Sequence, residues 1–122
     1  MKVVFVACAV ALLVGGCSKE RLSTAQYEAR NTELMTAITA VFAADGKDCP
    51  KLAGAIERFL VERKADMEAV VAFESSHPKD RANYELNTGL RLQREFAERA
   101  NPALEACAND QQFQDAWSRF TN

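Results

Sequence analysis

Ser75-Ser76-His77-Pro78 is the stretch that decides the fold, because it lies in the middle of a long helix-forming region. Proline disfavours helical backbone at the residue before it, so the stretch predicts a turn at His77. Cys49 and Cys107 each lie 29 residues from Pro78. Two antiparallel helices folded at this turn, each about 40 Å long at the usual rise per residue, bring both cysteines to the same end.

Ala, Leu, Glu, Arg and Gln dominate the chain on both sides of this turn, and no segment shows the alternation typical of strands. A first helix is predicted over residues 24–44, with Ser23 as its cap and Gly46 in a left-handed conformation after its end. Its apolar residues share one helical face: Tyr27, Leu34, Met35, Ile38, Val41 and Phe42.

A second helix is predicted over residues 49–75. Asp48 suits its N-cap and Pro50 its first turn, where the missing N–H costs nothing. The apolar stripe of this helix is interrupted by Arg63, whose stem can pack while its head reaches water. The stripe consists of Leu52, Ile56, Phe59, Leu60, Met67 and Val70.

A third helix is predicted to start at Lys79 or Asp80, with an inward stripe of Leu86, Leu90, Phe96 or Ala97, Ala100 and Leu104. Asn101-Pro102 either kinks this helix or starts a new one. Asn109 or Asp110 begins a short last helix, since Asn109 with Gln112 resembles a capping box. The expected fold is all-α: a small antiparallel bundle of three long helices plus a short C-terminal helix, over residues 23–122.

The first 17 residues have the form of a leader. Lys2 precedes an apolar run from Val3 to Val14, about 12 residues, which is too short for a membrane span of about 20 and indicates a cleaved secretory signal. Val14-Gly15-Gly16-Cys17 resembles the lipobox of bacterial lipoprotein precursors. The alternative is an ordinary secretory signal in which Cys17 is incidental.

The lipoprotein resemblance implies several expectations. Residues 1–16 are a signal peptide, and Cys17 becomes the first mature residue, thioether-linked to diacylglycerol and N-acylated, for example with palmitate. Residues 17–22 form a tether that holds the domain to a membrane of the cell envelope, facing the periplasm. Ser18 stands where the sorting rule of enteric bacteria has Asp for inner-membrane retention, which favours the outer membrane.

The leader and the lipid account for Cys8 and Cys17, which leaves Cys49 and Cys107 in an exported, oxidising compartment. Such a pair predicts a disulfide. A free thiol pair and an intermolecular bridge are the alternatives.

The composition excludes several functions. The chain has 15 basic and 17 acidic residues, well mixed, so it has neither a basic footprint for nucleic acid nor a polybasic lipid-binding patch. His77 is the only histidine, and no metal, haem or nucleophile motif accompanies it. Met35 and Met67 lie on apolar stripes and are interpreted as core filler. We therefore expect no catalytic residue, no metal and no cofactor.

Phe113, Trp117 and Phe120 give the last helix a strongly apolar face. This face either caps the groove of the longer helices or forms an exposed strip for a protein partner or the bilayer interface. The leading hypothesis is a non-catalytic, membrane-anchored accessory module that binds an unknown protein. The alternative is a bundle that binds a small apolar ligand, suggested by gaps at Gly89 and Gln93 in the third helical stripe.

Overall fold

The computed structural model describes residues 21–122, so the leader, the lipobox and Cys17 lie outside the described residues. Within residues 21–122 the chain is helical and contains no strand, which confirms the predicted all-α class. The elements are α2 (Thr24–Asp45), α3 (Cys49–Glu62), α4 (Lys64–Ser76), α5 (Pro78–Tyr84), the π-helical segment η3 (Glu85–Gly89), α6 (Leu90–Ala106) and α7 (Gln111–Thr121).

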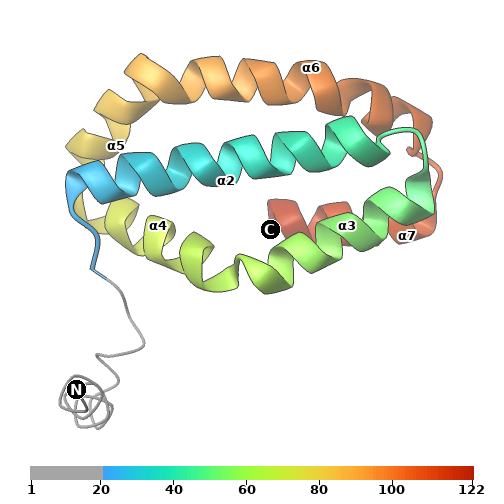
Figure 1. Cartoon of the computed structure of the whole chain (residues 1–122), viewed down its shortest axis with the longest axis horizontal. Coiled ribbons are helices and arrows are strands. Elements are labelled where there is room, and N and C mark those ends of the chain that lie inside the picture. Colours follow the sequence, from blue (N-terminus) through green and yellow to red (C-terminus); the bar gives the residue numbers. More distant parts are fainter. Residues whose placement is uncertain (1–20) are drawn as a thin grey trace, which may run out of the picture.

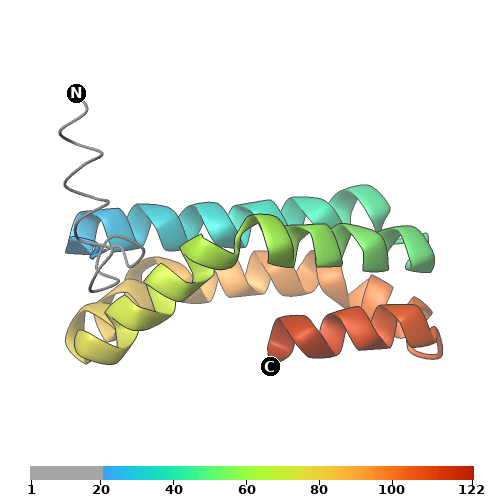
Figure 2. The same cartoon turned by 90° about the horizontal axis from the view of Figure 1, so that it is seen from below.

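These elements form three antiparallel arms and a short cover (Figure 1). Helix α2 is the central arm, α3 and α4 together form the second arm, and α5, η3 and α6 form the third. Helix α7 turns back and packs on α3, and α6 packs on α2. Seen from below, α7 covers only the α3 end of the bundle (Figure 2). The predicted bundle of three long arms and a short last helix is confirmed.

A disulfide joins the second and third arms, as the positions of Cys49 and Cys107 predicted. The Cα atoms of the two cysteines are 5.6 Å apart. The hairpin turns at His77, between α4 and α5. The disulfide lies at the end of the bundle where α2 finishes and α3 begins with Cys49, whereas α2 starts at the opposite end (Figure 1). Helix α2 has 22 residues, so about 33 Å of helix separates the two ends.

Local caps explain where the helices begin. The Ser23 hydroxyl accepts a hydrogen bond from the Gln26 N–H, and the Gln26 side chain accepts one from the Ser23 N–H, which completes a capping box. Asp48 accepts from the Lys51 N–H, with Pro50 in the first turn of α3, as predicted. The last helix is capped by Asp110, whose carboxylate accepts from the Phe113 N–H at 2.8 Å. The suggested box of Asn109 and Gln112 is therefore wrong.

Gly46 follows α2, but the prediction of a left-handed conformation is wrong. Its backbone is right-handed, with φ of −62° and ψ of −12°. The position requires glycine for another reason: a Cβ there would lie 2.5 Å from the Phe42 carbonyl oxygen. The chain therefore leaves α2 by a tight turn that only a residue without a side chain can make.

The second arm is not the single helix that the sequence predicted. It breaks at Arg63, whose φ of −107° and ψ of 12° separate α3 from α4. The guanidinium of Arg63 lies 3.5 Å from the Glu33 carboxylate on α2 and 3.4 Å from Asp66 on α4. Arg30 on α2 pairs with the same Asp66 at 3.0 Å. The break therefore coincides with a charged network that links the second arm to α2.

The third arm differs from the prediction in its first part. Leu86 and Leu90, expected to point inward, are 73% and 49% exposed. Ala100 is buried, and Phe96 and Leu104 are partly buried against the core, as predicted. The other buried positions of this arm are Tyr84, Gly89, Leu92, Ala103 and Cys107. The π-helical turn of η3 contains one extra residue, and this places Tyr84 on the inward face. Pro102 lies inside α6, which continues to Ala106, so no new helix starts at Asn101.

Candidate functional site

The bundle end that carries the N-terminal residues of the described chain is well packed. Leu22 is only 8% exposed and belongs to the core, so the chain is fixed to the bundle from this residue onward. The Thr24 hydroxyl donates to the Asp80 carboxylate at 3.3 Å, which links the start of α2 to α5.

Tyr27 is the centre of this end. Its ring is fully buried, stacks on Phe73 with centroids 4.5 Å apart and meets the edge of Tyr84 at 5.5 Å. Its hydroxyl donates to a Glu74 carboxylate oxygen at 2.7 Å and accepts from the Asn31 amide at 3.4 Å. Burial, together with the neighbouring Glu74 carboxylate, raises the pKa of Tyr27 far above its ordinary value.

Tyr84 has a similar setting on the third arm. Its ring is 4% exposed, and its hydroxyl is 2.8 Å from the Thr32 hydroxyl on α2. Burial raises the pKa of Tyr84 too. Burial therefore keeps both phenols protonated to a higher pH than an exposed tyrosine, and their hydroxyl groups join α2 to α4 and to the third arm.

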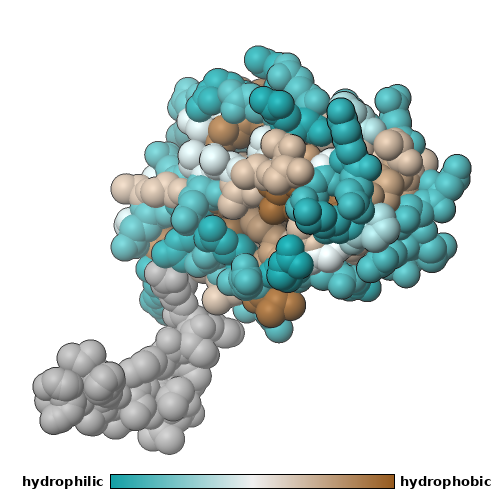
Figure 3. All heavy atoms as spheres, turned by 45° about the vertical axis from the view of Figure 1, so that its right-hand side comes forward, coloured by the Kyte–Doolittle hydropathy of each residue, from teal (hydrophilic) through white to brown (hydrophobic). Residues whose placement is uncertain are grey.

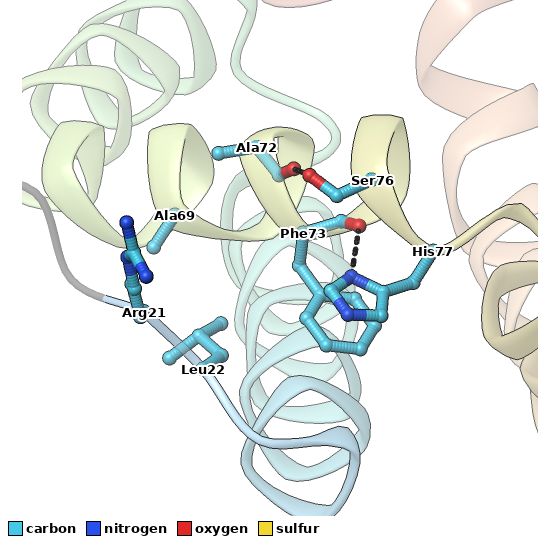
Figure 4. A pocket seen from close by; sticks show the side chains of 7 residues that line it. All are labelled: Arg21, Leu22, Ala69, Ala72, Phe73, Ser76 and His77. Carbon is cyan, nitrogen blue, oxygen red and sulfur yellow. Dashed lines mark hydrogen bonds between the residues drawn. The ribbon is translucent and has the colours of Figure 1, made fainter.

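A pocket of ≈550 Å³ opens beside Arg21 and Leu22 (Figure 4). Most of its wall is apolar, and α4 supplies most of its lining. The lining residues are Arg21, Leu22, Ala69, Ala72, Phe73, Ser76 and His77. The Ser76 hydroxyl donates to the Ala72 carbonyl at 3.1 Å, so it is already satisfied by its own helix.

His77, the only histidine, lies at the rim of this pocket. Its ring stacks on Phe73 with centroids 4.0 Å apart, and its Nδ1 is 3.1 Å from the Phe73 carbonyl oxygen. Both contacts close the turn between α4 and α5. No group of three or more potential metal ligands occurs among residues 21–122.

The aromatic residues of α7 lie mainly inside the molecule. Phe113 is fully buried, whereas Trp117 and Phe120 are partly buried and pack on the core. Trp117 meets Phe42 edge-on at 5.7 Å, and Phe120 meets Phe59 at 6.2 Å. Of the three residues suggested as an interaction surface, Phe113 has no accessible area for a partner. The face caps the longer helices.

An ion pair between Arg119 and Glu57 also fastens α7 to α3. Next to this pair, Leu60, Val61 and Lys64 line a shallow pocket of ≈510 Å³ at the exposed end of α7. The pocket contains one well-exposed apolar side chain, Val61, at 78% exposure.

The most exposed apolar pair is on the third arm. Leu86 and Leu90 are four residues apart and share one helical face, and both have accessible side chains. We call these two residues the leucine pair. On the face drawn in Figure 3, hydrophobic residues are exposed among hydrophilic ones in several places. The sequence predicted that the leucine pair points into the core. The one feature that favours the observed arrangement is the five-residue spacing between Tyr84 and Gly89, which a π-helical turn brings together.

Within residues 21–122, none of the helices combines the length and the hydrophobicity that a membrane span requires. Comparison of the whole chain with protein-family models, with curated proteins and with solved structures found no match.

Proposed function

We propose that this protein is a lipid-anchored, non-catalytic module of the bacterial cell envelope that binds another protein. Two features support the proposal. The sequence Val14-Gly15-Gly16-Cys17 resembles a lipobox, and Leu22, five residues after Cys17, is part of the core. The domain would therefore stand close to the membrane on the periplasmic side, with the outer membrane favoured by Ser18.

The observation that carries the binding function is the leucine pair. Leu86 is 73% exposed and Leu90 is 49% exposed, so both leave apolar surface in contact with water. Their chain neighbours Glu85 and Arg91 are charged. Two such side chains on consecutive helical turns match the contact that a partner helix or groove makes with an amphipathic helix. Burial of this surface in a complex would stabilise it by the hydrophobic effect.

Anchoring is tested by metabolic labelling with an alkyne-bearing fatty acid in the native host. The wild-type chain is expected to carry the label and to sediment with outer-membrane vesicles. Cys17→Ala is expected to lose the label. A Cys107→Ala variant serves as the control for cysteine loss and should keep it. An unlabelled wild-type protein would contradict the anchoring proposal.

Partner binding is tested by crosslinking in intact cells, followed by quantitative mass spectrometry. The double variant Leu86→Glu/Leu90→Glu is expected to lose at least one specific partner that the wild-type chain captures. Val71→Glu is the matched control, because Val71 is 60% exposed and lies on α4, away from the pair. An identical set of captured proteins for all three chains would contradict the proposed role of the leucine pair.

The second candidate function is binding of a small apolar ligand. The sequence suggested it because of gaps at Gly89 and Gln93, but the structure supports it through another feature. Gly89 leaves no gap, because the Tyr84 ring packs against it. The pocket beside Leu22 is the feature that favours this function, and its size lies in the range of about 300–1,000 Å³ typical of ligand sites.

A further inference from the structure

We propose that the pocket between Leu22 and α4 is an acyl-chain site, and that its occupant is one hydrocarbon chain of the lipid carried by Cys17. The inference rests on the proposed lipid anchor and adds a specific contact between that anchor and the fold. It accounts for a pocket that opens at the one end of the bundle where the lipid would be attached.

The first argument is reach. Arg21 and Leu22 line the pocket, and Cys17 precedes Arg21 by four residues. Four residues span at most about 14 Å between Cα atoms. A lipid at Cys17 is therefore held near the pocket mouth whatever path the intervening chain takes. A ligand tethered this closely has a local concentration on the order of millimolar.

The second argument is chemistry. Leu22, Ala69 and Phe73 supply buried apolar surface. The two polar side chains that α4 and its turn contribute are already engaged with backbone carbonyls, Ser76 with Ala72 and His77 with Phe73. Figure 4 shows both interactions beside the lining residues. Arg21 adds a charged side chain to the lining. The rest of the wall offers a hydrocarbon chain apolar contact and gives a polar ligand few groups to bind.

The third argument is shape. Ala69, Ala72 and Ser76 follow one another at spacings of three and four residues, so these small side chains lie in a row along α4. The row extends over eight residues, about 12 Å of helix. Phe73 and Leu22 border it. A row of small side chains leaves space along α4 that suits an extended methylene chain.

Two tryptophan variants distinguish the effect of filling the pocket from the effect of a large side chain elsewhere on α4. Ala72 lines the pocket and is exposed, so Ala72→Trp places a large ring in the pocket without disturbing a buried position. Val71→Trp is the matched control, since Val71 is the adjacent residue, is 60% exposed and does not line the pocket. Helicity and the unfolding midpoint of both variants show whether the fold is kept.

The measurement uses the full lipidated protein, purified from membranes, stripped of phospholipid and held in perdeuterated detergent. Nuclear Overhauser contacts are recorded from ¹³C-labelled alanine methyl groups to acyl-chain protons. We expect contacts at Ala69 and Ala72 in the wild type and in Val71→Trp. The contacts at Ala69 should disappear in Ala72→Trp. Ala65, which is exposed on α4 outside the pocket, should show none in any chain.

Mass spectrometry of the N-terminal peptide distinguishes the ways in which the inference can fail. If Cys17 is acylated but Ala69 and Ala72 show no acyl contacts, the acyl-chain site is wrong and the lipid anchor stands. Contacts at Ala69 that persist in Ala72→Trp overturn the assignment to this pocket. Contacts that are present before phospholipid is stripped and absent afterwards overturn the assignment to the Cys17 lipid. An unacylated Cys17 removes the anchor and the inference together.

Discussion

The Tyr84 ring lies against Gly89, five residues further along the chain, and a Cβ at Gly89 would stand 3.5 Å from the ring atoms Cδ2 and Cε2. In an α-helix, residues three or four apart are neighbours, whereas the π-helical turn of η3 brings residues five apart together. This contact sets the register of the third arm, because it places Tyr84 inward and leaves Leu86 in solvent.

The register predicts opposite effects for two leucines of the third arm. Leu92 is 7% exposed and Leu86 is 73% exposed. We expect Leu92→Ala to lower the free energy of unfolding by about 2–5 kcal/mol and Leu86→Ala to change it by no more than about 0.5 kcal/mol. Urea unfolding followed by circular dichroism measures both. A larger loss for Leu86→Ala than for Leu92→Ala would show that the third arm has the register expected from the sequence.

Two glycines should respond differently to alanine. At Gly46 the added Cβ meets the Phe42 carbonyl oxygen at 2.5 Å, so Gly46→Ala should destabilise the protein by about 1–3 kcal/mol. At Gly89 the shortest contact is 3.4 Å, to Glu85 Cγ. Gly89→Ala should therefore be neutral or stabilise by up to about 1 kcal/mol through helix propensity. Thermal unfolding of the two single variants decides this, and a Gly46→Ala protein as stable as the wild type would contradict it.

Removal of the disulfide should weaken the fold without changing its topology. Cys49 and Cys107 close a loop of 58 residues, and the loss of this constraint on the unfolded chain corresponds to about 4 kcal/mol in the loop-entropy estimate. The double variant Cys49→Ala/Cys107→Ala is expected to show this decrease in urea unfolding and to keep its far-ultraviolet spectrum. A decrease below about 1 kcal/mol would mean that the packing of α7 on α3 holds this end by itself.

Stability should fall in alkali because of the buried phenols. The pKa of Tyr27 is raised in the folded protein, so below pH 10 both states keep the proton and the stability is complete. Above about pH 10 the unfolded state loses the proton and the folded state keeps it, which lowers the free energy of unfolding by up to about 1.4 kcal/mol per pH unit for this group.

Tyr27→Phe tests this linkage. At neutral pH it should cost about 0.5–1.5 kcal/mol, because the hydrogen bond to Glu74 is lost. Between pH 9 and 11 the stability of the variant should decline less steeply than that of the wild type, as measured by urea unfolding at each pH. Parallel pH profiles for the two proteins would contradict a buried, protonated Tyr27.

Features encoded by neighbouring residues could be predicted from the sequence. Ser23 and Asp48 cap helices because their side chains reach N–H groups three residues away. The turn at His77 follows from Pro78 alone. The Cys49–Cys107 pairing was predicted because the leader and the lipobox resemblance account for the other two cysteines, and equal helix lengths on both sides of the turn allow the two to meet. Each of these inferences needs only local spacing and a regular rise per residue.

Features that depend on contacts between arms could not be predicted in this way. Helix α3 ends at Arg63, whose guanidinium pairs with Glu33 on α2. The residues next to Arg63 in the sequence do not predict this ion pair. Tyr84 and Gly89 both face the core only because the π-helical turn contains one extra residue. The period of an ordinary α-helix would place Leu86 on the inward face instead. The pocket beside Leu22 exists because a segment before the first helix docks on α4, which the sequence interpretation treated as a free tether.

The docking of Leu22 has a consequence for release of the domain from a membrane. If Cys17 carries a lipid, the covalent path between lipid and core runs only through residues 18–21, since Leu22 is already buried. A protease that sheds the domain intact must cut within this short stretch, where Lys19 and Arg21 are the basic residues that a trypsin-like enzyme would recognise. Cleavage farther along requires the core to open first, so shedding at those sites would be governed by the stability of the bundle.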